Sequence, residues 1–205
     1  MDLARETVEL LVQVVRDCYF DDNRRGLRDR EWTALRFLSR ANRFSRTPSA
    51  LAVFMGTTRA TASQIVMALE QKAYLVRERS QRDKRSVMLC VTPLGEKLLT
   101  QHDPINSVIS AVAALAPDDG IKLRGWLREI VARVDKPHDQ AETGHCRDCI
   151  FLVRSSTDAC SGKSRAKAEL LCRFHRTPVI AEEANLLCTS FERSRDQQNG
   201  VPEGT

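Results

Sequence analysis

The 205-residue sequence has no long apolar run and no segment arranged like an export signal. A membrane-spanning helix needs about 18 or more consecutive apolar residues, and no stretch approaches that length. The first residues, Met1 to Glu6, carry acidic side chains instead of the basic-then-apolar order of a secretory signal. We therefore expect a cytoplasmic protein that does not interact with a membrane.

The motifs of several enzyme classes are also missing. The chain has no Gly-rich phosphate loop, no nucleophile elbow and no paired metal-binding histidines. A dithiol oxidoreductase based on Cys146 and Cys149 is the remaining enzymatic alternative. It is disfavoured because no strand followed by a helix, which would lower the pKa of such a thiol, surrounds residue 146. We predict a protein that is not an enzyme.

Basic residues outnumber acidic ones by 32 to 27, which gives a formal net charge of +5. A modest excess of this kind favours a polyanionic partner only weakly. The local distribution is more informative, because the segment from Arg77 to Arg85 has five basic and two acidic residues. This concentration of positive charge favours nucleic acid as the partner.

Apolar residues at helical spacing predict helices over residues 7–20 and 30–41. A short helix is expected to open at Thr47-Pro48-Ser49 and to stop at Gly56, because Thr or Ser caps helices and Gly ends them. The next helix is expected over 58–72, with Thr57 as its cap. Two short helices separated by a tight turn predict a helix-turn-helix.

Residues 74–79 and 86–91 are rich in branched side chains and are joined by a polar turn, which predicts a β-hairpin, the wing. A long helix is then expected after Thr92-Pro93-Leu94-Gly95, running to about Ala116, and another over 117–134. Their broad apolar faces, with that of the first helix, predict a dimer surface. The fold class is mainly α with a small β-hairpin wing, an α+β winged helix that dimerises through its N- and C-terminal helices.

A winged helix-turn-helix places its second helix in the major groove of DNA, and an Arg of the wing can enter the minor groove. Helix starts can offer hydroxyl and backbone N–H groups to phosphates. The groove-facing residues expected here are Thr58, Arg59, Thr61 and Gln64, and the phosphate contacts are Ser49 and Thr57. The expected contacts of the wing are Arg82, Asp83 and Arg85.

The order of these elements and their local sequences resemble the MarR family over about residues 5 to 135. The residues that carry the resemblance are Trp32, Leu35, Thr47 to Ala52, Ala62 to Val66, Leu69-Glu70, Asp83-Lys84-Arg85 and Val91 to Gly95. The resemblance implies a homodimeric transcriptional repressor that binds a near-palindromic double-stranded operator. It also implies that Arg85 reaches the minor groove and that Asp83 steadies the wing. Tyr74 departs from the pattern, since the family usually has Gly there.

The composition changes after residue 136, and five of the seven cysteines follow that point although few large apolar residues do. Cellular thiols keep cytoplasmic cysteines reduced, so these residues do not predict a disulfide scaffold. We expect residues 1–136 to form the DNA-binding and dimerisation domain and residues 137–193 to form a small module stabilised by a metal. Residues 194–205 are expected to be a disordered tail.

Cys146 and Cys149 are separated by two residues, a spacing that lets two thiolates chelate one metal ion, and Cys172 and Cys188 can complete a tetrahedral site. Cys160, His175 and His145 are alternates. The sequence around these cysteines also looks like a compact four-cysteine module of small bacterial proteins. An iron–sulfur cluster, which would sense oxygen, nitric oxide, iron or redox state, is favoured over structural zinc, because a spare cysteine suits a signal input. With zinc, the resemblance to the MarR family implies that a small, often phenolic effector in the dimer pocket would be the signal.

Overall fold

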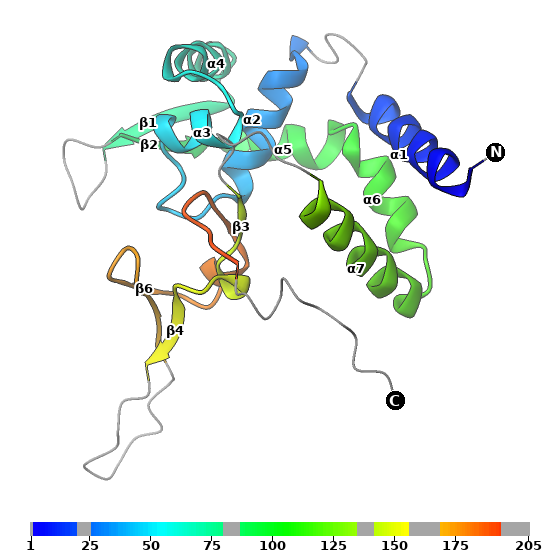
Figure 1. Ribbon diagram of the computed structural model, residues 1–205. Helices are drawn as coiled ribbons and strands as arrows, with labels where there is room; N and C mark the ends of the chain where they lie inside the picture. The colour runs from blue at the N-terminus through cyan, green and yellow to red at the C-terminus, as the bar shows by residue number, and fades with distance from the viewer. Residues whose placement is uncertain (1, 20–25, 80–86, 135–141, 156–168, 194–205) are drawn as a thin grey trace. The chain divides into compact units, whose positions relative to one another are not determined.

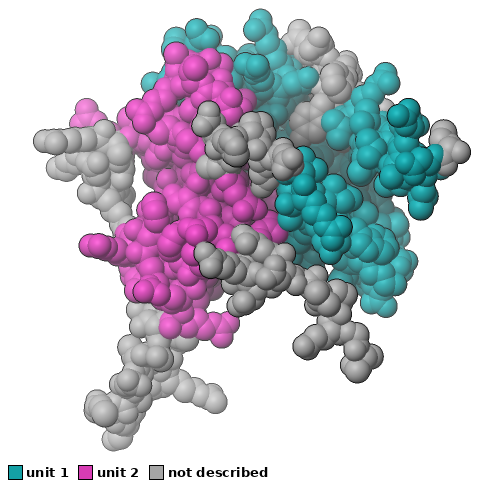
Figure 2. Space-filling model, in the orientation of Figure 1, with its two compact units in different colours: residues 1–39, 63–77, 90–136 teal, residues 40–62, 78–89, 137–205 magenta. Residues whose placement is uncertain are grey.

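The computed structural model describes residues 2–19, 26–79, 87–134, 142–155 and 169–193 (Figure 1). The wing residues Arg82, Asp83 and Arg85, together with Cys160 and the tail 194–205, lie outside the described residues. The chain divides into two units (Figure 2): residues 1–39, 63–77 and 90–136 form unit 1, and residues 40–62, 78–89 and 137–205 form unit 2.

Unit 1 is mostly helical. Its helices are α1 (Leu3–Tyr19), most of α2 (Asp29–Arg40), most of α4 (Arg59–Gln71), α5 (Pro93–His102), α6 (Ile105–Ala113) and α7 (Pro117–Arg133). The apolar side chains of α2 recur at helical spacing, and Trp32, Leu35 and Leu38 are buried. The prediction of a mainly helical winged-helix fold is confirmed, and burial of such faces stabilises it.

The single helix expected between residues 92–95 and Ala116 is wrong, because the chain leaves the helical conformation at Asp103. Asp103 has an extended backbone with ψ of 122°, and α6 begins only at Ile105. Pro104 causes the break, since the proline ring disfavours the helical conformation of the residue before it. The buried Asp103 carboxylate accepts hydrogen bonds from the Arg36 guanidinium at 2.6 to 2.9 Å. The interruption therefore places a charged pair between α2 and the α5–α6 junction.

The helix-turn-helix consists of α3 (Pro48–Phe54) and α4 (Arg59–Gln71). Thr47 caps α3, since its Oγ1 accepts a hydrogen bond from the backbone N–H of Ala50 at 3.1 Å. The expected cap of α4, Thr57, is wrong by one position. The Oγ1 of Thr58 accepts the hydrogen bond from the backbone N–H of Thr61, also at 3.1 Å, so Thr58 is the capping residue.

The wing strands are β1 (Leu75–Arg79) and β2 (Val87–Val91), which pair in a two-stranded sheet. The turn from α4 into β1 has its left-handed residue at Ala73, with φ of 59°, and not at Tyr74. The Tyr74 carbonyl accepts a hydrogen bond from the N–H of Thr92, and a Cβ on Gly95 would come within 2.5 Å of the same oxygen. Gly95 therefore permits a close backbone approach.

The described residues of the C-terminal segment form a small β module rather than a disordered chain. Strand β3 (Gly144–His145) pairs antiparallel with β7 (Leu187–Cys188), and β4 (Leu152–Ser155), β5 (Glu169–Cys172) and β6 (Thr177–Val179) form an antiparallel sheet in that order. Two short 3-10 helices, η2 (Cys146–Asp148) and η3 (Glu183–Asn185), complete it. Across the described ranges, no helix combines the length and apolarity that crossing a bilayer requires.

Candidate DNA-binding surface and cysteine cluster

The DNA-contacting residues expected on α3 and α4 differ in exposure. Four of the six, Ser49, Thr58, Arg59 and Gln64, are exposed, and Thr57 and Thr61 are half-buried. The hydroxyls of Thr58 and Thr61 lie 3.0 Å apart and hold the first turn of α4 together. The start of α4 thus offers one exposed cation, Arg59, beside polar groups that the helix cap has already ordered.

The described strands of the wing carry two further basic residues. They belong to the positively charged segment of the sequence but were not among the predicted DNA contacts. Arg77 and Arg79 are both exposed on β1. Arg77 forms a 3.1 Å ion pair with Glu70 of α4, which offsets part of its charge. The charge density of the sequence indicates this strand as a candidate DNA contact. Only the structure shows that both side chains are exposed.

Four cysteines from three separate parts of the module line one cavity. They are Cys146, Cys149, Cys172 and Cys188, and the other lining residues are Asn42, Phe44, Phe151, Leu152, His175 and Ser190. We call this the cysteine cavity, and all of it lies within unit 2. The structure thus brings together the four sulfurs of the favoured ligand set and the alternate His175.

Local structure explains how these sulfurs converge. The backbone N–H of Cys149 donates to the carbonyl of Cys146 at 3.0 Å, which closes the tight turn between these two cysteines. The antiparallel register places Cys188 opposite Gly144, two residues before Cys146. It also places Cys172 opposite Leu152. The strand pairings therefore bring the later cysteines to the turn that holds the first two.

The thiols of Cys146 and Cys188 are buried, with 7% and 4% of each residue exposed, and interact directly. The hydrogen bond from the Cys146 thiol lowers the pKa of Cys188 to about 5, against the opposing effect of burial. The same hydrogen bond, followed by burial, raises the pKa of Cys146. The pair therefore favours one thiolate and one thiol, and the thiolate is the metal-binding form of cysteine.

N–H groups donate to sulfur atoms in the cysteine cavity, and the backbone at Ser190 also hydrogen-bonds to Cys188. The Asn42 side chain donates from Nδ2 to the Sγ of Cys146 at 3.2 Å, and the backbone N–H of His175 donates to the Sγ of Cys172 at 3.5 Å. The alternate His145 instead pairs its Nδ1 with the carbonyl of Asn185 at 2.8 Å. Within the described ranges, no three Cys, His, Asp or Glu side chains are grouped as they stand in a way that could hold a metal ion.

Sequence reasoning missed the contribution of residues 41–46, which connect α2 to α3. Asn42 and Phe44 from this segment line the cysteine cavity, and the ring of Phe44 stacks on that of His175 with centroids 4.0 Å apart. Asn42 lies 104 positions before Cys146 in the chain. No spacing or periodicity could have indicated this contact, because it depends on how distant segments fold together.

The paired strands β1–β2 after α3 and α4 define a winged helix-turn-helix protein. Residues 25–86 match the sequence model of the MarR family. Transcriptional repressor MprA of Escherichia coli (strain K12) is 27% identical over 116 residues, which cover 54% of this chain and 64% of MprA. A mutant of S. aureus MepR shares the fold, with a TM-score of 0.51 and 15% identity over 66% of this chain and 100% of that one.

The resemblance to the MarR family that the sequence had indicated is thus confirmed over residues 25–86. The chain spans 64% of the length of the curated relative MprA. The family match ends at residue 86, before the cysteine module begins. The module therefore has to be interpreted from its own residues.

Proposed function

We propose that this chain is a DNA-binding transcriptional repressor that binds a near-palindromic operator as a homodimer. The observation that carries the proposal is the exposed polar set on α3 and α4, with Arg59 at the start of α4, followed by a basic hairpin. In a protein of this class the second helix of the motif enters the major groove. The name of MprA as a transcriptional repressor supports the same function here.

Each polar group has a role that suits its chemistry. Arg59 can donate two hydrogen bonds to a guanine edge, and Gln64 can pair with an adenine edge. Ser49 and Thr57 contact phosphates, which positions the helix without reading sequence. Arg85 at the wing tip enters the minor groove, where negative potential favours a guanidinium.

The DNA-binding proposal is tested with a duplex selected from a randomised double-stranded library. The Arg59→Ala variant is expected to lose about tenfold or more in affinity, the usual effect of one good base contact. Arg85→Ala is expected to reduce the slope of log affinity against log salt by about 0.9. Lys97→Ala, an exposed cation on α5, is the control and should bind as the parent does. Failure to enrich any duplex, or unchanged binding by both arginine variants, would overturn the proposal.

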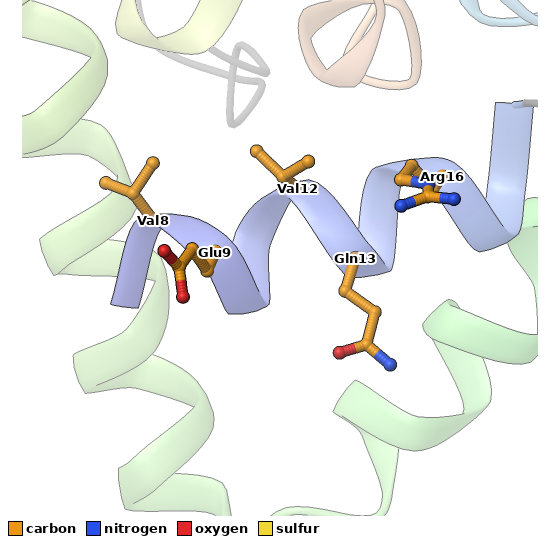
Figure 3. A pocket seen from close by; sticks show the side chains of 5 residues that line it. All are labelled: Val8, Glu9, Val12, Gln13 and Arg16. Carbon is orange, nitrogen blue, oxygen red and sulfur yellow. The ribbon is translucent and has the colours of Figure 1, made fainter. Parts of the chain in front are cut away.

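The homodimer is proposed from the apolar side chains that unit 1 leaves exposed. Trp126 of α7 is 60% exposed, and Ile109 of α6 and Val12 of α1 are also exposed. Surface patches of this kind in a protein of this size usually mark interaction sites. Figure 3 shows Val8 and Val12 on the same side of α1. Together with Glu9, Gln13 and Arg16 they line a hollow.

Sedimentation equilibrium tests the dimer with two substitutions on one helix. Val12→Asp is expected to shift the protein toward monomer, because a charge would be buried in the apolar contact. Thr7→Asp is the matched control, since Thr7 is an exposed residue of α1 that is not among those lining the hollow. A parent protein that is monomeric at micromolar concentration would refute the homodimer, and equal effects of the two variants would refute this surface.

We also propose that Cys146, Cys149, Cys172 and Cys188 hold an iron–sulfur cluster that responds to redox state, oxygen or iron supply. Four thiols on one cavity match the ligand number of such clusters. The cavity is partly apolar, with Phe151 in its wall, and N–H groups donate to sulfur atoms in it. Burial and hydrogen bonds to sulfur are the features that set cluster potentials. Binding requires the Cys146 thiol to lose its proton, which removes its hydrogen bond to Cys188.

The metal proposal is tested by anaerobic purification, a visible absorption spectrum, and analysis of iron, sulfide and zinc in one sample. Iron with sulfide supports the cluster. About one zinc per chain replaces it with a structural site, and a small effector at the α1 hollow then becomes the candidate signal. Cys146→Ser should lose the metal, and Cys90→Ser on β2 is the control that should keep it. Absence of metal from the parent protein would overturn the proposal.

A further inference from the structure

One buried side chain joins the cysteine cavity to the turn before the helix-turn-helix. Asn42 is 1% exposed, and its Oδ1 accepts hydrogen bonds from the backbone N–H groups of Phe44 at 3.1 Å and Ser45 at 3.0 Å. A backbone N–H can only donate, so the amide oxygen must face these groups. The NH₂ group therefore faces the Sγ of Cys146, to which it donates at 3.2 Å.

The turn that Asn42 holds leads directly into α3. Thr47, two residues after Ser45, caps that helix through the 3.1 Å hydrogen bond from Ala50. The carbonyl of Arg46 accepts a 2.7 Å hydrogen bond from the N–H of Leu89, a buried residue of the wing strand β2. The turn is thus attached both to the helix-turn-helix and to the wing.

Other contacts hold residues 41–46 against the module without involving the Cys146 sulfur. The N–H of Asn42 donates to the carbonyl of Leu187 at 2.8 Å, and the N–H of Thr189 donates to the Oγ of Ser45 at 3.0 Å. Arg43 forms a 3.2 Å ion pair with Glu183. These contacts hold residues 41–46 against the module whatever the sulfur atoms bind. The side-chain amide of Asn42, by contrast, contacts the sulfur of Cys146, a proposed metal ligand.

We propose that the Asn42 carboxamide transmits the metal occupancy of the cysteine cavity to the helix-turn-helix, an inference that rests on the metal centre proposed above. An N–H group binds an anionic sulfur more strongly than a neutral thiol, because the hydrogen bond is then charge-assisted. A metal-bound Cys146 sulfur holds the amide, and through it the turn at Phe44 and Ser45. The start of α3 is then more firmly placed, so DNA affinity depends on metal occupancy.

The test compares DNA affinity of metal-loaded and metal-free protein for one selected duplex. Metal is loaded with iron and sulfide anaerobically, or with zinc where zinc is the metal found. The parent protein is expected to show a ratio of about tenfold between the two states, within the usual range of coupling between sites. Asn42→Asp keeps the acceptor for the turn but places an oxygen toward the sulfur, and the ratio should fall to within about twofold of unity. Asn185→Asp is the matched control, since Asn185 is an exposed asparagine of the same module whose Oδ1 accepts from Arg147.

Metal content and circular dichroism are measured on every sample. If Asn42→Asp lowers the helical signal, Asn42→Ser takes its place, because a serine can still accept from the turn but is too short to reach the sulfur. A variant that binds metal and keeps the parent ratio would overturn the inference, as would a loaded parent protein with a ratio of one. Both results leave the metal centre standing, whereas a parent protein without metal refutes the centre and this inference with it.

Discussion

The helical elements around the DNA-binding motif and the cysteine module bury different kinds of side chain. Leu35 of α2, Leu51 of α3 and Leu69 of α4 are all completely buried. The described part of the module instead buries Phe191 together with the thiols of Cys146 and Cys188. Apolar burial stabilises a region in any redox state, whereas a core built on thiols depends on what the sulfur atoms bind. The two regions are therefore expected to respond to different perturbations.

The largest expected effect follows removal of the proposed metal with a chelator under anaerobic conditions. Amide hydrogen exchange in β5 and β7 should accelerate by about a hundredfold or more, because metal-binding free energy is folding free energy in a small module. Exchange in the middle of α2 should change by less than about twofold. Equal acceleration of exchange in α2 and in the cysteine module would show that the metal does not stabilise the module selectively.

Truncation of a buried leucine tests the other side of the comparison. Leu35→Ala is expected to reduce the free energy of unfolding by about 2–5 kcal/mol, through lost burial and the cavity that remains. Leu94→Ala is the control, since Leu94 is 51% exposed, and it should change stability by less than about 0.5 kcal/mol. Denaturant unfolding followed by helical circular dichroism measures both, and similar losses would contradict a core centred on α2.

A smaller loss is expected where α5 meets the backbone of Tyr74. Gly95→Ala should destabilise unit 1 by about 1–3 kcal/mol, because the added Cβ would meet a carbonyl oxygen that cannot move without the chain. Gly120→Ala in α7 meets no atom within 4 Å, and it should stabilise the helix by up to about 1 kcal/mol. Thermal unfolding of the two variants should therefore shift in opposite directions.

The smallest effect is a gain at the turn from α4 into β1. Ala73→Gly is expected to stabilise the protein by up to about 1 kcal/mol, because glycine adopts a positive φ without steric cost although it gains entropy when unfolded. Ala68→Gly, inside α4, should destabilise by about the same amount. A loss of stability from Ala73→Gly would mean that this residue does not adopt the left-handed conformation in solution.

Several elements were predictable because their signals are local. Apolar spacing indicated α2, α4 and α7, and turn residues indicated the end of α3 and the presence of the wing. The α5–α6 break was missed although Pro104 was visible, because the periodic apolar pattern continues across it. The cap of α4 was misplaced because Thr57 and Thr58 are chemically equivalent, and only backbone geometry distinguishes them.

The sequence alone indicated the resemblance to the MarR family, the order of the winged-helix elements and a set of cysteines with ligand spacing. It did so because helical period, turn chemistry and chelate spacing all depend on neighbours in the chain. The contact between Cys146 and Cys188 and the hydrogen bond from Asn42 to Cys146 depend on the tertiary structure. Asn42 precedes the DNA-binding motif in the chain, whereas both cysteines follow it. Those contacts arise from strand register and from the docking of residues 41–46 on the module, which no local pattern encodes.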